Sequence, residues 1–369
     1  MDVNLRIEII NKSFGKVYKH IPAVQEKVTI EWTRKGAPGL LKFKVLKTEK
    51  LDFDNGDDVS VWLDERMIFG GRIFEKSRND TDFIDVKAYD GLRYFKNKNT
   101  IVYRAKAPTT PETLGSLVKW LAGRYGYESG KNFVDFSKNV DGETPTTKYR
   151  LKPRVEWVVP EFDIIQNATD ETLRNTGELF VMYMEVAELD DGSFGERIAL
   201  KRLGSDDMKL GISVNSSSGE GFSYVSSIDD QTYNSIVLLY KDEEKGQVIS
   251  VSRPGAEKAS PNVERWGLLQ FQDELSANDS DPQLKADTLY ELYNVEGRRL
   301  SVSKVFGDIK MRPGFTVMVN LNDMIGDITL PKDYPMMIEK VIHTFELDHH
   351  YANLTLRDGG GTGGGVFNA

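Results

Sequence analysis

The feature that most constrains the fold is a pattern of alternating apolar residues near the end of the sequence. Two β-type runs lie between residues 336 and 359, where they flank the polar turn Asp348–His350. The second run ends at Asp358-Gly359, after three apolar residues that share one face: Ala352, Leu354 and Leu356. Period-two alternation closed by turn residues is typical of an antiparallel strand with one buried face.

The same pattern occurs once before, which indicates a duplication. The earlier run ends at Asp90-Gly91, after the alternating residues Ile84, Val86 and Ala88. Each copy follows a V-x-V-x-L segment, Val59–Leu63 in the first copy and Val317–Leu321 in the second. The second copy is longer, and its extra residues fit in the loop MIGDITLPKDYP. Because the three landmarks keep their order, we predict a duplicated small β domain.

The composition is that of a globular protein with room for several cores. The chain has 369 residues, of which 39% are hydrophobic, and this length suits two or three domains. No apolar run approaches the roughly 20 residues that span a bilayer, and the first residues show no secretory signal, so membrane insertion is not expected. The lack of cysteine excludes disulfides, and the net charge of −9 argues against nucleic-acid binding.

We predict a mainly β fold with an α/β insertion, divided into four segments. Residues 1–98 form a first β domain, because apolar residues alternate along each of its predicted strands. Residues 99–225 form the α/β insertion. Residues 226–358 form a second β domain with a helical insert and a strand from Trp266 to Gln272. Residues 359–369, GGGTGGGVFNA, form a low-complexity tail.

Caps and apolar stripes predict three helices. The first begins at Thr110-Pro111, an N-cap followed by proline in the first turn, and ends at Gly126. The second runs from Glu161 to about Asn175 on a stripe of apolar residues. The third begins after Asp281-Pro282 and ends at Gly297.

The sequence predicts no catalytic, cofactor-binding or metal-binding residues, and hence no enzyme. The pattern around His343 is typical of a core-edge histidine bonded to a backbone carbonyl, and a metal site of His343, His349 and a carboxylate is the alternative. The acidic segment Asp52–Asp58 contains the turn dipeptide Asn55-Gly56, and a cation site there is the alternative to a plain turn. No hydrolase elbow, zinc-protease motif or P-loop occurs.

Both ends of the chain resemble one family, the XkdQ-type baseplate hub of contractile phage tails and phage-tail-like bacteriocins, and the middle matches it loosely. At the N-terminal end the resemblance rests on Trp32, Lys35–Gly39, Leu41–Val45, Gly56–Val59, Ile68–Phe74, Ala88–Leu92, Tyr94 and Lys96–Thr100. At the C-terminal end it rests on Ile338–His343, His350 and Leu354–Leu356.

The resemblance implies a homotrimer in which each protomer carries two tail-tube-like β barrels. Three protomers then form a pseudo-six-fold ring around the tail channel, as a symmetry adaptor between two neighbours. The hexameric tail tube protein stacks above it and the trimeric central spike protein attaches below. The other implied partners are the tape-measure protein and the baseplate wedge proteins. An acidic lumen would let DNA or the tape measure slide through.

For the interfaces we expect the two long hairpins, residues 66–89 and 337–357, with the Gly-rich tail as a strap toward the spike or a neighbour. The expected interface residues are Phe74, Tyr89, Phe345, Tyr351 and Gly359. The alternative for both hairpins is a purely intramolecular barrel wall.

The expected location is the baseplate of a virion or tail-like particle that assembles in the cytoplasm of the host bacterium. Three other functions stay open. One is the tail-tip hub of a non-contractile tail, and another is a tail-associated cell-wall hydrolase. The third is the hub of an effector-delivery spike, for which the chain ends early.

Overall fold

The computed structural model describes residues 4–11, 18–102, 112–124, 149–188, 194–204, 208–229, 231–242, 247–254, 261–275, 281–326 and 331–358. Among these residues no helix is both long enough and apolar enough to cross a membrane. The predicted Gly-rich tail lies outside the described residues. The predicted start of the first helix at Thr110-Pro111 is wrong, because the helix begins at Leu114 after the N-cap Thr113. Strands predominate, so the prediction of a mainly β fold is confirmed.

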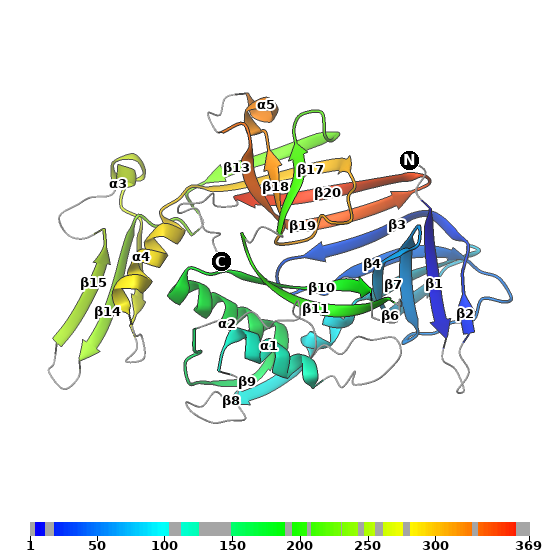
Figure 1. Ribbon diagram of the computed structural model, residues 1–369, viewed down its shortest axis with the longest axis horizontal. Helices are drawn as coiled ribbons and strands as arrows, with labels where there is room; N and C mark the ends of the chain where they lie inside the picture. The colour runs from blue at the N-terminus through cyan, green and yellow to red at the C-terminus, as the bar shows by residue number, and fades with distance from the viewer. Residues whose placement is uncertain are drawn as a thin grey trace.

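One large sheet forms the body of the molecule (Figure 1). Its strands are β1 (Leu5–Asn11), β2 (Tyr18–His20), β3 (Val24–Thr33), β4 (Leu40–Leu46), β5 (Asp58–Leu63), β6 (Arg66–Arg78), β7 (Phe83–Tyr89), β12 (Lys209–Val214), β13 (Gly221–Ser227), β17 (Gly297–Phe306), β18 (Thr316–Val319), β19 (Tyr334–Glu346) and β20 (His349–Asp358). The strand order is β13-β17-β20-β19-β3-β4-β7-β6-β5-β1-β2, and β18 pairs with both β19 and β12.

The same strand order occurs twice in this sheet. The first copy runs β3-β4-β7-β6-β5, and the second runs β13-β17-β20-β19-β18, with antiparallel pairing throughout. Each copy also carries a register shift at the same point of its long hairpin, between Ile73 and Glu75 in β6 and between Ile338 and Lys340 in β19. In the first copy the shift comes directly after the cross-strand pair of Ile73 and Ala88, and in the second it comes directly after the pair of Ile338 and Leu356. The repeated sequence landmarks therefore occupy matching positions in a repeated topology.

The two copies share one hydrophobic core because their sheets are continuous. Strand β3 pairs antiparallel with β19, from Thr33 opposite Lys340 to Lys27 opposite Glu346. Alternation along each strand sends one face inward, so Ile30 of β3 and Val341 of β19 are fully buried in the same cluster. The inward residues of both final hairpin strands, such as Val86 and Leu354, join them there.

The insertion covers one side of this sheet. It contains β8 (Lys98–Val102), α1 (Leu114–Gly123), β9 (Val155–Pro160), α2 (Glu161–Thr176), β10 (Phe180–Glu188) and β11 (Phe194–Arg202). The apolar residues along one face of this first helix are buried: Leu114, Leu117, Val118, Leu121 and Ala122. Thr113 caps the helix in a capping box with Ser116. The second predicted helix is confirmed as α2, which ends where Gly177 adopts a left-handed conformation.

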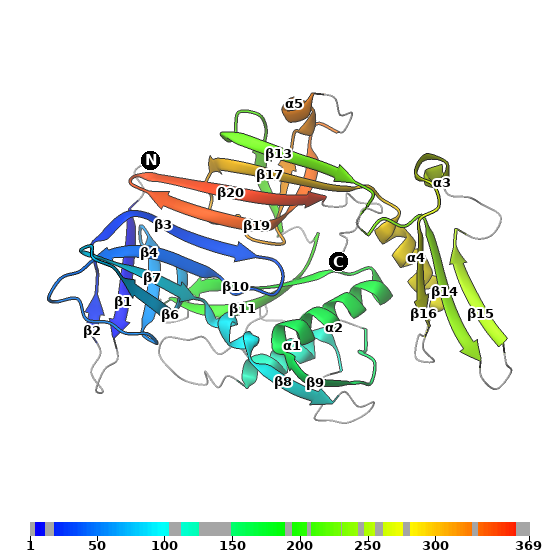
Figure 2. The ribbon, with the colours of Figure 1, turned by 180° about the vertical axis from the view of Figure 1, so that it is seen from behind.

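A small three-stranded sheet lies at the far end of the molecule, beyond the insertion (Figures 1 and 2). It contains β14 (Ser235–Asp242), β15 (Gln247–Arg253) and β16 (Gln270–Glu274), with α3 (Pro261–Trp266) and α4 (Pro282–Tyr293). Asp281 caps α4 and proline follows it, as predicted. Two sequence predictions are wrong here. Trp266 ends helix α3 instead of beginning a strand, and α4 ends at Tyr293 while Gly297 begins β17.

Replacing Ile30 by alanine is expected to lower the free energy of unfolding by about 2–5 kcal/mol, because it removes a fully buried side chain at the strand pair that joins the two copies. Replacing Thr29 by alanine should lower the free energy of unfolding by less than about 1 kcal/mol, because this side chain points to the other face of the same strand. Urea unfolding followed by circular dichroism measures both. Equal losses for the two variants would contradict the continuous core.

Candidate assembly interface

Two predicted interface residues, Phe74 and Tyr89, lie together on the outer face of the β6–β7 hairpin. Their rings meet edge to face at a centroid distance of 5.6 Å. The guanidinium of Arg93 stacks over both rings, 5.1 Å from the centroid of Phe74 and 5.9 Å from that of Tyr89. Both aromatic side chains are half-buried, so part of this cluster is accessible to another chain.

The other three predicted residues have different surroundings. Phe345 is 2% exposed and stacks on His350 at a centroid distance of 4.2 Å, so its side chain belongs to the core and is not available to a neighbouring subunit. Tyr351 is half-buried on β20, with the ammonium of Lys304 6.0 Å from its ring. Gly359 lies outside the described residues.

The ends of two equivalent strand pairs carry exposed apolar residues. Leu46 of β4 lies opposite Phe83 of β7, and Phe306 of β17 lies opposite Tyr351 of β20. These positions correspond in the two copies. Leu46 is 37% exposed and Phe306 is 82% exposed, and the hairpin tip residue Leu347 is 81% exposed. We call these two cross-strand pairs the strand-end pairs.

Sequence reasoning missed Phe306 because of a change in alternation along β17. Leu300 and Val302 point inward, and simple alternation would send Phe306 inward with them. The register shifts between Val302 and Val305, where Lys304 adopts a left-handed φ of 50°. The shift reverses the phase, so that Val305 is buried and Phe306 points outward. No local sequence signal marks this bulge.

The guanidinium of Arg312 lies where the two copies and the insertion meet, and it contacts all three parts. Arg312 lies in the segment before β18, and its guanidinium carbon is 3.8 Å from the ring centroid of Trp32 in β3. Its Nη1 donates to the carbonyl of Met184 in β10 at 2.8 Å, and its Nη2 donates to the carbonyl of Ile68 in β6 at 3.3 Å. Desolvation lowers the pKa of Arg312 to about 10, so the group stays charged at neutral pH.

Two histidines hold the Arg312 segment against the long hairpin. His343 is fully buried, and its Nε2 lies 2.9 Å from the carbonyl of Met311, as predicted for a core histidine. A carbonyl only accepts, so this nitrogen carries the proton, and Nδ1 accepts from Nε2–H of His350 at 2.9 Å. Desolvation lowers the pKa of His343 to about 3 and that of His350 to about 4. The pair is therefore neutral above mildly acidic pH.

Two carboxyl groups are buried close to this junction. Asp90 accepts from the backbone N–H of Gly39 at 2.8 Å and from that of Leu92 at 3.2 Å, and it caps the 3₁₀ helix η2 (Gly91–Lys96). Desolvation nevertheless raises its pKa to about 7. Desolvation also raises the pKa of Glu196 in β11 well above its usual value. Sequence reasoning missed both, because burial of a single acidic residue leaves no local pattern.

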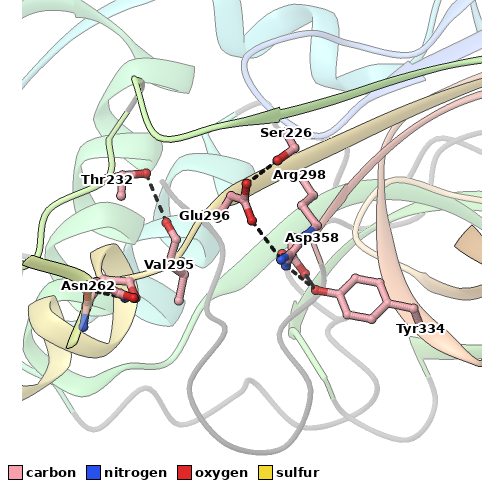
Figure 3. Close-up of polar contacts among 9 residues, drawn as sticks. Ser226, Thr232, Asn262, Val295, Glu296, Arg298, Tyr334 and Asp358 are labelled. Atoms are coloured by element: carbon pink, nitrogen blue, oxygen red, sulfur yellow. Dashed lines mark hydrogen bonds and ion pairs between the residues drawn. The ribbon is translucent and has the colours of Figure 1, made fainter. Parts of the chain in front are cut away.

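Asp358, which holds the position of Asp90 in the second copy, joins a polar cluster (Figure 3). It accepts from Nη1 of Arg298 at 3.1 Å and from the hydroxyl of Tyr334. Arg298 also donates to Glu296 at 3.1 Å, and Glu296 accepts from Ser226. The cluster thus cross-links β13, β17, β19 and β20.

Among the described residues, no three histidine, aspartate or glutamate side chains lie close enough together to hold a metal ion. In the acidic segment that resembled a cation loop, the carboxylate of Asp57 accepts from the backbone N–H of Asp54 at 2.7 Å. Lys76 pairs with the carboxylate of Asp54 and donates to the carbonyl of Phe53. The segment is a turn whose charge is partly neutralised from within the chain.

Comparison with known proteins gives a family and a fold. A family model described as YQBQ-like matches residues 28–357, and no curated protein matches the sequence. The 43 kDa tail protein of prophage MuSo2 from Shewanella oneidensis shares 13% identity at a TM-score of 0.54, over 95% of this chain and 98% of that chain. Prophage tail protein gp18 from Listeria monocytogenes EGD-e shares 14% identity at a TM-score of 0.53, over 96% and 94%.

A third similar structure is the E. coli c3393 protein, described as a component of the type VI secretion system with structural similarity to T4 bacteriophage tail proteins. It shares 11% identity at a TM-score of 0.55, over 99% of this chain and 79% of that chain. At such low identity these likenesses establish a common fold. The family match and the common fold confirm the resemblance to phage-tail proteins that the sequence shows.

Replacing Arg312 by lysine is expected to lower the free energy of unfolding by about 1–3 kcal/mol. An ammonium group cannot lie flat on Trp32 while it donates to two separate carbonyls. Lys310→Ala, an exposed change in the same segment, should cost less than about 0.5 kcal/mol. Urea unfolding at pH 7 compares the two. A neutral Arg312→Lys variant would contradict the role given to the guanidinium.

Replacing His350 by phenylalanine is expected to flatten the acid side of the stability profile. Because folding lowers the pKa of His350 to about 4, its contribution is present above the unfolded value near 6.5 and is lost as the pH falls below it. Between about pH 6 and pH 4.5, the free energy of unfolding of the variant should therefore fall by about 1.4 kcal/mol less per pH unit than that of the unmodified protein. Chemical unfolding at a series of pH values measures the slope. An unchanged slope would rule out this assignment.

Proposed function

The chain belongs to the YQBQ-like family, and from its fold we propose that it is a structural baseplate hub of a phage tail or tail-like particle. In this role it forms a trimer that joins the hexameric tail tube to the trimeric central spike around the tail channel. The observation that carries the proposal is the repeated strand order, with strand-end pairs at equivalent positions of both copies.

Symmetry explains why such a chain would contain two copies of one topology. A trimer of chains with two similar docking surfaces each presents six quasi-equivalent surfaces to a six-fold tube. A single set of three-fold surfaces on the other face suits a trimeric spike. The strand-end pairs support this arrangement, since each places an apolar residue at the end of β4 or β17, where another subunit can cover it.

In this proposal the first tube-like unit comprises residues 1–98. The second comprises residues 226–358 together with β12 and β13, which begin within the predicted insertion 99–225 but pair with β18 and β17 of the large sheet. The two units are not separate bodies in the protomer, because β3 and β19 pair and one core serves both. This joint would fix the angle between the two docking surfaces of one protomer.

Contacts between protomers would use the outer face of the β6–β7 hairpin and the exposed part of the β19–β20 hairpin. The aromatic cluster of Phe74, Tyr89 and Arg93 is half-buried, and stacked aromatic and arginine side chains are common anchors of protein interfaces. In the second copy, Tyr351 would contribute to the contact between protomers. Phe345 would support the β19–β20 hairpin from inside the core.

The charge of the channel does not follow from the net charge of −9 per chain. The outer face of β3, β4 and β7 has a hollow of about 400 Å³ lined by four lysines: Lys27, Lys42, Lys44 and Lys87. Asp85 and Glu75 pair with two of them. A channel lined by this face would be of mixed charge, so the acidic lumen stays a prediction that depends on which face turns inward.

A second candidate is the hub of an effector-delivery apparatus. The specific observation is the shared fold with the type VI secretion component from E. coli, which this chain matches over 79% of that chain. Both candidates need the same ring, and they differ in the neighbours that the ring contacts. A tail-tip hub of a non-contractile tail needs that ring as well.

The hub proposal predicts that the purified protein has three times the protomer mass of 41.7 kDa by light scattering. Class averages by electron microscopy should show six similar densities around a channel. Replacing Phe74 by aspartate should convert the trimer to a folded monomer, because a charge would enter an apolar protomer contact. Asn79→Asp adds the same charge at the exposed hairpin tip and should leave the trimer intact.

A folded monomer for the unmodified protein, with no ring at any concentration, would contradict the trimeric hub. The cell-wall hydrolase alternative would then be tested by loss of turbidity in a cell-wall suspension. A Phe74→Asp variant that still forms trimers would remove this hairpin face from the protomer contact while leaving the hub itself in place.

A further inference from the structure

A cavity of about 210 Å³ lies where β6, β10 and β12 meet the segment that precedes β18. Apolar side chains form most of its wall, among them Ile68 and Phe315. Arg66, Lys310 and Arg312 line it as well, so three cations face one small space. The cavity is smaller than the roughly 300–1,000 Å³ of sites for drug-sized ligands, and its size suits a small acid or a single side chain.

The guanidinium of Arg312 is held in a fixed position beside this cavity. Its Nη1 donates to the carbonyl of Met184, its Nη2 donates to the carbonyl of Ile68, and its carbon lies 3.8 Å from the ring centroid of Trp32. A guanidinium carries more N–H groups than these two bonds use. A cation that is already fixed, with donors to spare, can bind an anion without first being ordered.

Arg66 and Lys310 reach the same cavity from two different elements, and both are exposed. Arg66 is the first residue of β6, and the backbone N–H of Lys310 donates to the carboxylate of Asp308 at 2.9 Å, which fixes its turn. The acidic turn residues Asp64 and Glu65 precede Arg66 but do not line the cavity. Within the described ranges, no carboxylate forms an ion pair with the side chain of Arg66 or Lys310.

The cavity therefore has an excess of positive charge. One carboxylate, Glu185 of β10, also lines it and attracts Arg312, but Glu185 already pairs with Arg197 of the neighbouring strand β11. Burial is the main cause that lowers the pKa of Arg312, and the positive charge of Arg66 lowers this pKa further. The chain has 57 acidic and 48 basic residues, so its composition does not account for a cavity in which cations predominate.

An anion in the cavity would relieve the repulsion between these cations, and its attraction to them would be stronger beside apolar walls than in water. The walls also select the kind of anion. Phosphate has no apolar part to bury, whereas an aliphatic stem gains free energy from leaving water. A carboxylate can accept two parallel hydrogen bonds from one guanidinium. The lining therefore favours an aliphatic carboxylate.

We propose that this cavity binds a carboxylate group on a short apolar stem. Arg312, Arg66 and Lys310 bind the carboxylate, and the apolar part of the wall encloses the stem. A free aliphatic acid shares this chemistry with the C-terminus or a glutamate side chain of a polypeptide, and the test separates these sources. The hub role does not use this site, so the inference is independent of that role.

The test is a ligand-detected NMR titration of the purified full chain with 4-methylpentanoate, and the matched control is its neutral amide. The carboxylate should bind saturably, with a dissociation constant of about 1 mM or tighter. The amide should bind at least about tenfold more weakly, because it lacks the charge. Acetate and inorganic phosphate, measured by competition, should also bind at least about tenfold more weakly, because neither has a stem to bury.

Two variants locate the site. Arg66→Gln should weaken the binding of 4-methylpentanoate about threefold or more, whereas Arg78→Gln, the same change at the exposed far end of β6, should leave it unchanged. Lys310→Ala should weaken it as Arg66→Gln does. All three positions are exposed, so the variants should fold, and circular dichroism checks this.

Four results would each overturn the proposal. They are a lack of saturable binding by 4-methylpentanoate, equal binding of the acid and its amide, binding of phosphate as tight as that of the acid, and equal effects of Arg66→Gln and Arg78→Gln.

Two peptides distinguish the sources of the carboxylate. The peptide acetyl-Ala-Ala-Leu carries the 4-methylpentanoate skeleton at its C-terminus, and acetyl-Ala-Glu-Ala-amide carries a glutamate side chain. A peptide that competes at least as well as 4-methylpentanoate assigns the site to a chain end or to an acidic side chain, respectively. Failure of both peptides assigns it to a free acid. A protein that binds the acid but never forms a ring would refute only the hub.

Discussion

The antiparallel pairing of β3 with β19 is the constraint on which the rest of the molecule depends. It makes the two copies of the topology one sheet with one core, and it brings Trp32 of the first copy next to His343 of the second, with ring centroids 5.3 Å apart. Arg312 then closes the joint, since its guanidinium stacks on Trp32 and binds carbonyls of β6 and β10. A hub built from this protomer would inherit a fixed angle between its two docking surfaces.

Buried ionisable groups gather around this joint, and their pH dependences oppose one another. Folding lowers the pKa values of His343 and His350, so their contribution to stability is lost on acidification. Folding raises the pKa values of Asp90 and Glu196, so the contribution of these carboxyls is present at low pH and is lost as the pH rises. Such groups often mark active sites, but here hydrogen bonds that fix the strands and the 3₁₀ helix account for three of the four. Glu196 is the exception.

The two copies have kept their topology and diverged in chemistry. Asp90 caps a 3₁₀ helix, while Asp358 at the corresponding position binds Arg298 and Tyr334. The strand-end pair of the first copy exposes Leu46 modestly, and that of the second exposes most of Phe306. In the proposed trimer, quasi-equivalent surfaces of this kind would dock the same neighbour six times, while their differences would specify the three-fold partner.

The sequence by itself determined what short-range patterns encode. Period-two alternation located the strands of both final hairpins, the apolar stripes located α1 and α2, and the repeated landmarks revealed the duplication. Tertiary structure alone decided that β3 joins β19, that His350 partners His343, that Arg312 covers Trp32, that Phe345 is buried and that Phe306 is exposed. The reason is physical. Alternation and capping act between residues a few positions apart, whereas the burial and charge of a polar group depend on partners such as Trp32 and Arg312, which are distant in the chain and meet only when the sheet closes.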